Sequence, residues 1–345
     1  MSLYHLLRPL VFKLDAERAH RATIAALKLR TGTGFPPEPP STQTLETTVA
    51  GLSFPNPIGL AAGFDKDAEV FEQMLSLGFG AVEVGTLTPR PQAGNPQPRL
   101  FRLVEDEAVI NRLGFNNRGQ ADALRRIERR ARWRGVIGVN VGANKDSKDF
   151  VADYVAGLTA MAPVADYLTV NISSPNTPGL RGLQDEGALK ALLEAVRDAK
   201  AGKPMFLKVA PDLAGGDPER IVRAAIDHGI AALIVANTTI TRPPLKSRFA
   251  DQAGGLSGRP LRPIALDMLR QFARASGGAI PLIGVGGIAS ADDAWARIRA
   301  GASLVQLYTA MVFDGPGIAR RIARGLAEQV ERAGFANIAE AVGTE

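Results

Sequence analysis

Short apolar segments recur along the chain from Ile58 onward, and each is followed by a stretch that can form a helix. The segments read PIGLAAG, AVEVGT, VIGVNV, DYLTVN, MFLKVA, AALIVANT, PLIGVGG and SLVQLYT. Strands that are apolar on both faces and alternate with helices are typical of a parallel sheet covered by helices. Eight such units predict an α/β fold of the (β/α)8 TIM-barrel type rather than an open doubly wound sheet.

The positions of the helices and of a closing hairpin follow from the same pattern. The helices are expected to begin near Asp67, Asn116, Lys148, Glu186, Asp217, Arg262, Ser290 and Gly315. The segment LETTVAGLSFPNP, before the first strand, predicts a short hairpin that closes the bottom of the barrel. Residues 41–345 are therefore expected to form the barrel domain.

Residues 1–40 have a different pattern and are expected to form a small N-terminal helical extension. SLYHLLRPLVFKL and DAERAHRATIAALKLR predict two short helices, the second capped by Asp15, and TGTGFPPEPP predicts a stiff linker. Charges interrupt the apolar run, so a signal peptide is not indicated. The helices either cover one end of the barrel or form an amphipathic pair on a membrane surface, with a basic edge toward lipid phosphates.

Composition excludes several kinds of chemistry. The 345 residues are 46% hydrophobic and 22% charged, as in an ordinary globular protein, and the net charge of +6 suits an anionic ligand, an anionic lipid surface or nucleic acid. The absence of cysteine excludes disulfides, thiolate catalysis and iron–sulfur ligation on this chain. The three histidines, His5, His20 and His228, are far apart in sequence, so no metal site is expected. No apolar run approaches the roughly 18 residues of a membrane span.

Polar residues, lysines or glycine turns stand at the carboxyl end of every predicted strand, which is where such barrels carry their chemistry. These residues are Lys66, Thr86, Asn140, Asn171, Lys208, Asn237, Thr238, Gly286, Gly287, Tyr308 and Thr309. Each lysine either extends to solvent or faces the negative charge of a ligand. The glycines after the seventh strand, and the turn after the eighth, predict a site for a phosphorylated substrate or a flavin mononucleotide.

The segment NISSPNTPGL, from Asn171 to Leu180, concentrates small hydrogen-bonding residues at the end of the fourth strand. Such residues favour turns, which is one interpretation. The other is a platform for a substrate with a catalytic hydroxyl at Ser174, Ser173 being a turn hydroxyl. Because no histidine lies near Ser174 in sequence, a Ser-His-Asp hydrolase is poorly supported.

Taken together, several motifs resemble those of the dihydroorotate dehydrogenases, in the membrane-associated, quinone-dependent class. The motifs are IGLAAGFDKD, VEVGTLTPRPQAGNPQPRLFRL, NRLGFNN, NISSPNTPGLR, LKVAPD, ANTT, GGLSGRPL, and GVGGI followed by GASLVQLYT. The resemblance extends over nearly the whole chain. It implies oxidation of (S)-dihydroorotate to orotate in de novo pyrimidine biosynthesis, with hydride transfer to FMN and reoxidation of the flavin by a membrane quinone.

The resemblance also implies a role for individual residues. FMN would be bound by Ala62, Gly63, Thr86, Asn140, Asn171, Lys208, Ala236, Gly258, Gly287, Tyr308 and Thr309. Dihydroorotate would be bound by Lys66, Asn111, Arg112, Leu113, Gly114, Phe115, Asn171, Asn176, Asn237 and Thr238. Ser174 would be the catalytic base, and Thr177 and Phe115 would relay the proton and shield the site. Relatives often carry Thr or Ser at the position of Ala236, so a backbone contact alone is expected there.

For the second half of the reaction, the resemblance implies a quinone tunnel lined by His20, Arg102 and Tyr308, although His20 could equally serve only in packing. The implied protein is a monomer and a peripheral membrane protein at the cytoplasmic face of the bacterial inner membrane. It would bind no nucleic acid and no iron–sulfur partner subunit.

Two other functions are compatible with parts of the pattern. A tRNA dihydrouridine synthase is another flavin-dependent barrel, and its basic surface would bind RNA phosphates. That family relies on a cysteine acid, which this chain lacks, and the arginine-rich segment RRIERRARWR is interpreted as one solvated helix face. A non-enzymatic, membrane-tethered ligand-binding barrel would keep the phosphate loops but need no base.

Overall fold

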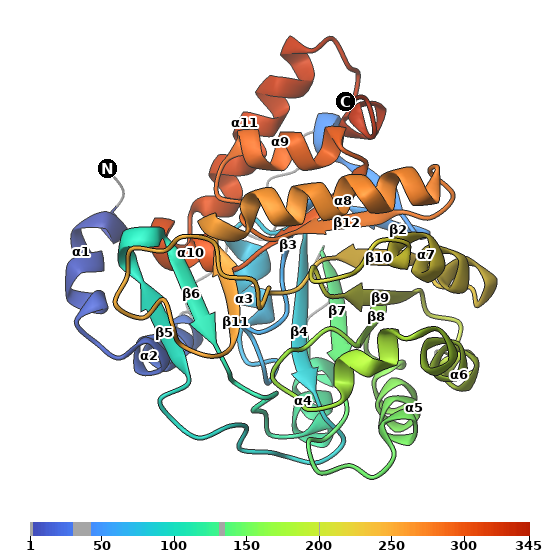
Figure 1. Cartoon of the computed structure of the whole chain (residues 1–345). Helices are drawn as coiled ribbons and strands as arrows, with labels where there is room; N and C mark the ends of the chain where they lie inside the picture. The colour runs from blue at the N-terminus through green and yellow to red at the C-terminus, as the bar shows by residue number, and fades with distance from the viewer. Residues whose placement is uncertain (1–2, 30–42, 131–134, 200) are drawn as a thin grey trace.

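The computed structural model describes residues 3–29, 43–130, 135–199 and 201–345, so the predicted linker at residues 31–40 lies outside the described part of the chain (Figure 1). Eight parallel strands close into a barrel in the order β3-β4-β7-β8-β9-β10-β12-β13. Their bounds are β3 Ile58–Leu60, β4 Ala81–Leu87, β7 Val136–Val141, β8 Tyr167–Asn171, β9 Met205–Val209, β10 Ala232–Val235, β12 Leu282–Val285 and β13 Ala302–Leu307. The predicted (β/α)8 barrel is confirmed.

Helices surround the barrel (Figure 1). They are α3 Phe71–Ser76, α4 Gln120–Glu128, α5 Phe150–Met161, α6 Glu186–Val196, α7 Asp217–Asp227, α8 Arg262–Ser276, α9 Ala291–Arg299, α10 Thr309–Asp314 and α11 Ile318–Arg332. In α11 the buried residues Ile318, Ile322, Leu326 and Val330 recur every fourth position, which gives the helix its apolar face.

The predicted helix starts are met at α6, α7 and α8 and are early for the others, most of all for α3 and α4, which begin at Phe71 and Gln120 instead of Asp67 and Asn116. Both predicted starts lie in loops. Asp67 accepts the backbone N–H of the distant Arg118 at 2.7 Å, and Asn117, next to Asn116, accepts that of Gly119 at 2.8 Å. An Asn side chain that binds a backbone N–H two residues further on competes with helix formation.

The hairpin is confirmed as the floor of the barrel. Strands β1 Thr47–Val49 and β2 Leu52–Phe54 pair antiparallel. Val49 and Phe54 are buried and belong to one apolar cluster with Ala81, Val136 and Leu304, which lie at or near the amino ends of barrel strands. The barrel is therefore closed at the end opposite the predicted site.

A small antiparallel sheet, which was not predicted, stands above the barrel. It consists of β5 Leu100–Leu103, β6 Ala108–Asn111 and β11 Gly255–Gly258, in the order β11-β6-β5. Leu256 is paired with Ile110 in register, and both are buried in an apolar cluster of their own with Phe101 and Leu103. The sheet joins two loops that are about 140 residues apart in sequence, so that part of the site is assembled from both.

Two N-terminal helices, α1 Leu3–Phe12 and α2 Ala16–Lys28, lie beside β5 and β6 (Figure 1). Asp15 caps α2 as predicted, since its side chain accepts the N–H groups of Glu17 and Arg18. On α1, by contrast, Leu6 and Leu10 are 66% and 62% exposed. In the described part of the chain, no helix combines the length and the hydropathy needed to cross a membrane.

Candidate active site

A cavity of about 490 Å³ extends from the carboxyl ends of the barrel strands to the N-terminal helices. Most of the predicted site residues line it: His20, Ala62, Gly63, Lys66, Thr86, Arg102, Asn111, Leu113, Gly114, Phe115, Asn171, Ser174, Asn176, Lys208, Ala236, Asn237, Thr238, Gly258, Gly287, Tyr308 and Thr309. Side chains scattered over some 290 residues of sequence are thus brought to one place, at the end of the barrel where the strand pattern predicts chemistry.

Three predicted residues lie outside this wall. Asn140 lies directly behind it, where its Oδ1 accepts the Thr86 hydroxyl at 2.6 Å. Arg112 points away, since its guanidinium donates to the Gln252 side chain at 2.9 Å and stacks over a phenylalanine ring. Thr177 is buried, and its hydroxyl has no hydrogen-bond partner among the described residues. A buried hydroxyl with unused hydrogen-bonding capacity beside the Ser174 loop is unusual and needs an explanation.

Lys208, on β9, is buried within the barrel, so the alternative that it extends to solvent is wrong. Its ammonium lies 3.9 Å from the carboxylate of Glu83, which is fully buried in β4. Burial lowers the pKa of Lys208, while the charge of Glu83 raises it. A buried lysine of this kind, with one edge on a cavity, can place positive charge against a bound anion.

Asn171 is held at both ends of its side-chain amide by the protein itself. Its Nδ2 donates to Thr86 Oγ1 and to Asn140 Oδ1, each at 3.1 Å. Its Oδ1 accepts both the backbone N–H and the hydroxyl of Ser173, at 3.2 and 2.8 Å. Because Thr86 Oγ1 and Asn140 Oδ1 are only 2.6 Å apart, the two Nδ2 contacts lie in one N–H direction, and the second N–H of Asn171 remains for a ligand.

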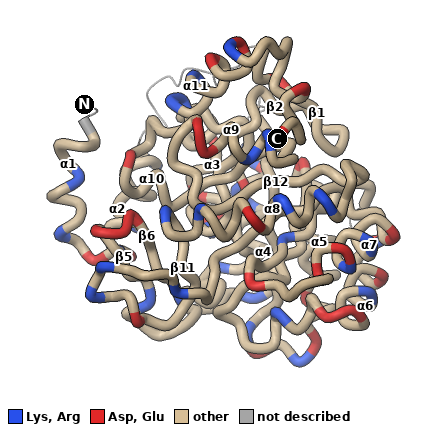
Figure 2. Tube along the Cα trace, turned by 45° about the horizontal axis from the view of Figure 1, so that its top comes forward, with Lys and Arg blue, Asp and Glu red and all other residues tan. Residues whose placement is uncertain are grey.

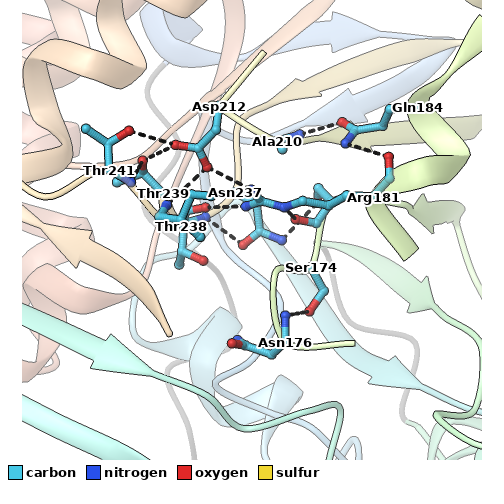
Figure 3. A network of polar contacts seen from close by, with 12 residues as sticks. Ser174, Asn176, Arg181, Gln184, Ala210, Asp212, Asn237, Thr238, Thr239 and Thr241 are labelled. Atoms are coloured by element: carbon cyan, nitrogen blue, oxygen red, sulfur yellow. Dashed lines mark hydrogen bonds and ion pairs between the residues drawn. The ribbon is translucent and has the colours of Figure 1, made fainter. Parts of the chain in front are cut away.

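Ser174 is buried in the loop that follows β8, next to Asn176 (Figure 3). Its hydroxyl oxygen accepts the backbone N–H of Asn176 at 3.2 Å. The side chain of Asn176 in turn donates to the carbonyl oxygen of Asn111 at 3.2 Å, at the end of β6. The loop after β8 and the small upper sheet therefore meet at Ser174.

An arginine fixes the Ser174 loop from behind (Figure 3). Arg181 donates to the carbonyl oxygens of Ser173 and Thr238, at 3.1 and 3.2 Å, and pairs with Asp212 at 2.9 Å. Burial raises the pKa of Asp212, but hydrogen bonds from Thr239 and the backbone of Ile240, together with the charge of Arg181, outweigh it, so that the pKa is lowered. The carboxylate thus stays ionised opposite the arginine.

Lys66 lies at the cavity wall and donates to the carbonyl oxygen of Gly63 at 2.8 Å. Burial lowers the pKa of Lys66 to about 8, although the negative charges of Glu17 and Asp67 act to raise it. At neutral pH the side chain is mostly protonated and available for a carboxylate.

Helix α2 is tied to the loop between β4 and β5 by a buried ion pair. Arg99 donates to both carboxylate oxygens of Glu17, at 2.7 and 3.0 Å, and to the carbonyl oxygens of Ala93 and Asn95. This hydrogen-bonded contact lowers the pKa of Glu17. Asn95 also donates to the carbonyl oxygen of Asn176 at 3.3 Å. Helix α2 is therefore joined to the Ser174 loop through Arg99 and Asn95.

Aromatic rings fill the passage between α2 and the strand ends. The His20 and Phe64 rings meet edge to face at 5.2 Å, and Phe64 and Tyr308 do so at 5.6 Å. Burial lowers the pKa of His20 to about 3, so its imidazole is neutral. Nearby, Arg102 stacks over the Phe12 ring at 4.3 Å, and its Nε is buried without a hydrogen-bond partner among the described residues. Aromatic rings and the Arg102 guanidinium thus lie together at this end of the cavity.

The glycines after β12 form a cradle in the cavity wall. Gly286 and Gly287 have φ of 108° and 70°, which side chains rarely adopt, and a Cβ on Gly287 would lie 2.4 Å from the Arg262 backbone. The first turn of α9 is closed by its own capping box between Ser290 and Asp293. The glycine cradle and the Tyr308–Thr309 turn, rather than α9, thus face the cavity.

Sequence reasoning missed Glu83, Arg181 and Arg99. Glu83 could have been noticed, because a carboxylate in the middle of the apolar run AVEVGT is as unusual as the lysine in MFLKVA. The two arginines gave no such signal, since their partners are distant in sequence. Among the described residues, no three metal-binding side chains come together.

Comparisons with known proteins agree with this geometry. Residues 44–330 match the family model for dihydroorotate dehydrogenase. Proteins named dihydroorotate dehydrogenase (quinone) from Novosphingobium aromaticivorans and Erythrobacter litoralis are each 62% identical to the chain, covering 100% and 99% of it and 100% of each relative. The crystal structure of DHODH from Eimeria tenella in complex with ferulenol superimposes with a TM-score of 0.91 at 38% identity, covering 96% of this chain and 95% of that one. The chain therefore belongs to the dihydroorotate dehydrogenase family, in its quinone-dependent class.

Proposed function

We propose that this chain oxidises (S)-dihydroorotate to orotate, the redox step of de novo pyrimidine biosynthesis, with FMN as cofactor and a membrane quinone as final electron acceptor. The observation that carries the proposal is that Lys66, Ser174, Lys208 and Asn237, from four different strand ends, share one cavity. The alternative of a tRNA dihydrouridine synthase is not favoured, since the relatives are dehydrogenases over their full length.

The residues of the cavity fit FMN. Lys208 offers a buried positive charge, Thr86 a hydroxyl, and Ala62, Gly63 and Ala236 a closely approachable backbone. The backbone of Gly258 and Gly287, together with Tyr308 and Thr309, would hold the phosphate end. Asn171 would contact the flavin from the side of this surface, and Asn140, which lies behind it, would hold Asn171 by a hydrogen bond. When bound, FMN supplies the hydride acceptor and passes the electrons on to quinone.

The opposite wall would bind the substrate. Lys66 would meet its carboxylate, and the amides of Asn111, Asn176 and Asn237 would meet its alternating C=O and N–H groups, with Asn171 held ready by its own hydrogen bonds. Backbone groups of Arg112, Leu113 and Gly114 and the hydroxyl of Thr238 complete this wall. The Phe115 ring would shield it, because Gly142 leaves room for that ring against Thr86.

Ser174 would take the ring proton that leaves when the substrate is oxidised. A serine is a weak base on its own, so the proton needs an onward path. The buried Thr177 hydroxyl, which has unused hydrogen-bonding capacity among the described residues, is the group we assign to that path. Burial of both groups would keep bulk water from the reacting carbon.

The N-terminal helices would receive the quinone. The Arg102 guanidinium, at the cavity wall, would donate to a quinone oxygen, and neutral His20 and Tyr308 would line the route to the flavin. Residues 1–40 would form the membrane-associating segment and residues 41–345 the catalytic barrel. The exposed leucines Leu6 and Leu10 would enter the lipid surface.

We place the protein at the cytoplasmic face of the bacterial inner membrane as a monomer, without an iron–sulfur partner subunit or nucleic acid. Figure 2 shows Lys and Arg interspersed with Asp and Glu over the outer helices, which does not resemble an RNA-binding face. Arg125 and Arg126, from the arginine-rich segment, each pair with Asp122 on their own helix, and residues 131–134 of that segment lie outside the described residues.

An acceptor panel with dihydroorotate as donor tests the proposal. The purified protein should be yellow, dihydroorotate should bleach it, and ubiquinone should restore the colour. Restoration by NAD or fumarate alone, with no response to quinone, would contradict the class of acceptor. A non-enzymatic binding barrel would show no bleaching.

A further inference from the structure

A row of hydrogen bonds leads from the cavity wall into the barrel interior, and every member donates in the same direction. The backbone N–H of Thr238 donates to Asn237 Oδ1 at 2.7 Å, and Asn237 Nδ2 donates to Ser173 Oγ at 2.8 Å. Ser173 Oγ then donates to Asn171 Oδ1 at 2.8 Å. Ser173 is therefore more than a turn hydroxyl, since it joins two asparagines of the cavity wall.

The row continues inward and ends on a carboxylate. Asn171 Nδ2 donates to Asn140 Oδ1 at 3.1 Å, and Asn140 Nδ2 donates to Glu83 Oε1 at 2.7 Å. Glu83 and Asn140 are fully buried, and Asn171 is 3% exposed. We call the side chains of Asn237, Ser173, Asn171, Asn140 and Glu83 the asparagine row.

Glu83 has the surroundings of an ionised carboxylate. Its Oε2 accepts Tyr167, Thr169 and Gln306, at 3.1, 3.2 and 3.0 Å, and the Lys208 ammonium lies beside its Oε1. An ionised carboxylate only accepts hydrogen bonds, whereas a carboxamide has one donating and one accepting end. The direction of the bond to Glu83 therefore determines how Asn140 is turned. The backbone N–H groups of Ser173 and Thr238, which can only donate, turn the Asn171 and Asn237 amides the same way, so that both ends of the row agree.

We propose that Glu83 is a positioning residue, which anchors the inner end of the asparagine row and, through the row, holds the Asn237 amide in the orientation that the backbone N–H of Thr238 favours. The proposal rests on the proposed function, in which Asn237 binds the pyrimidine ring. Matching donors to acceptors along a ring edge matters because a reversed amide would leave buried polar groups unpaired. Glu83 lies on β4 and Asn237 follows β10, so the effect crosses the barrel interior.

A double-mutant cycle on orotate binding tests this proposal. The dissociation constant of orotate is measured from the change in flavin absorption of the purified holoenzyme. Glu83→Gln keeps the shape of the side chain but lets it donate, and we expect about tenfold weaker binding. Ser173→Ala interrupts the row between Asn171 and Asn237, with a similar expected loss.

The two changes together should weaken binding no more than the larger single change, because an interrupted row cannot transmit the loss of Glu83. If Glu83 acts only as the charge partner of Lys208, the two losses should multiply to about a hundredfold, which would overturn the proposal. Normal binding by Glu83→Gln would overturn it as well. Asp166→Asn is the matched control, since this carboxylate accepts the backbone N–H of Ile137 at 2.8 Å at the opposite end of the barrel, and orotate binding should not change.

Neutron diffraction from deuterium-exchanged crystals of the unaltered holoenzyme tests the direction of the row, which the proposal requires, even if Glu83→Gln does not fold. Deuterium is expected on the Asn140 atom that faces Glu83 and on the Asn171 atom that faces Asn140, and the reverse arrangement would refute the proposal. A holoenzyme that does not bind orotate at all would instead overturn the proposed function, while the neutron map would still give the direction of the row.

Discussion

Arg181 and Asp212 form an ion pair, with 2.9 Å between Nη1 and Oδ2, that ties the Ser174 loop to the ends of β9 and β10 (Figure 3). The pair is mostly buried, at 22% and 12% side-chain exposure, and the same arginine also holds the carbonyl oxygen of Thr238. The position of Ser174 relative to the substrate wall therefore depends on a residue that lies behind the loop.

Replacing Arg181 with Met should slow the bleaching of the flavin by dihydroorotate about 10- to 100-fold, because a base displaced by about 1 Å loses much of its effect. Stopped-flow absorption measures this rate. Flavin content and reoxidation by quinone should be unchanged, and Arg181→Lys should recover part of the rate. Arg130→Met is the matched control, since Arg130 pairs with Asp166 at similar exposure, 27% and 28%, at the other end of the barrel. Equal slowing in both variants would indicate general destabilisation.

Replacing Ser174 with Ala should slow bleaching at neutral pH by about 10²- to 10⁴-fold, the contribution of a positioned general base. The flavin should remain bound, since Ser174 belongs to the substrate wall. Ser53→Ala, on the exposed edge of the floor hairpin, should bleach at the normal rate. Normal bleaching by Ser174→Ala would show that another group takes the proton.

Orotate binding should weaken as the pH rises through about 8, the pKa of Lys66 in the unliganded protein. Below that pH the ammonium is present and attracts the orotate carboxylate. Above it the free protein must first take up a proton, so the dissociation constant should rise about tenfold per pH unit. Titration of the flavin absorption change at several pH values measures this dependence. The Lys66→Met variant should bind orotate weakly at every pH, and its dissociation constant should not depend on pH in this range. The same pH dependence in that variant would show that another group causes it.

Replacing both Leu6 and Leu10 with Gln should release the protein from vesicles of anionic phospholipid and lower quinone turnover about tenfold, because two exposed apolar side chains are lost from the lipid surface. Bleaching by dihydroorotate should be unaffected. Ile226→Gln, on α7 and 43% exposed, is the control and should leave vesicle binding unchanged. Vesicle co-sedimentation and ubiquinone reduction measure the two effects, and retained vesicle binding would contradict the proposed role of α1.

The barrel could be predicted because the sequence patterns that specify its strands and helices are local. Each strand is a short apolar run and each helix has an apolar face, as the buried residue at every fourth position of α11 illustrates. The polar residues at the strand ends then meet necessarily, since parallel strands place their carboxyl ends at one rim. This is why Lys66, Asn171 and Lys208 could be assigned to one site from sequence position alone.

What sequence could not give are the contacts between distant segments. The upper sheet pairs Leu256 with Ile110, two residues in loops with no strand-like alternation. The partners of Arg181 and Arg99 depend on how loops are folded over the rim, which propensity does not determine. Similarly, the sequence predicted that Asn171 contacts a ligand, but it did not show that both ends of its amide are also held by Thr86 and Ser173.

The ion pair of Arg99 with Glu17 connects the two ends of the cavity. Arg99 also holds the backbone of the loop that contains Asn95, and Asn95 donates to the backbone of Asn176. Helix α2 therefore braces, through Arg99 and Asn95, the loop that carries Ser174. The segment proposed to receive the quinone thus also supports the substrate side of the cavity.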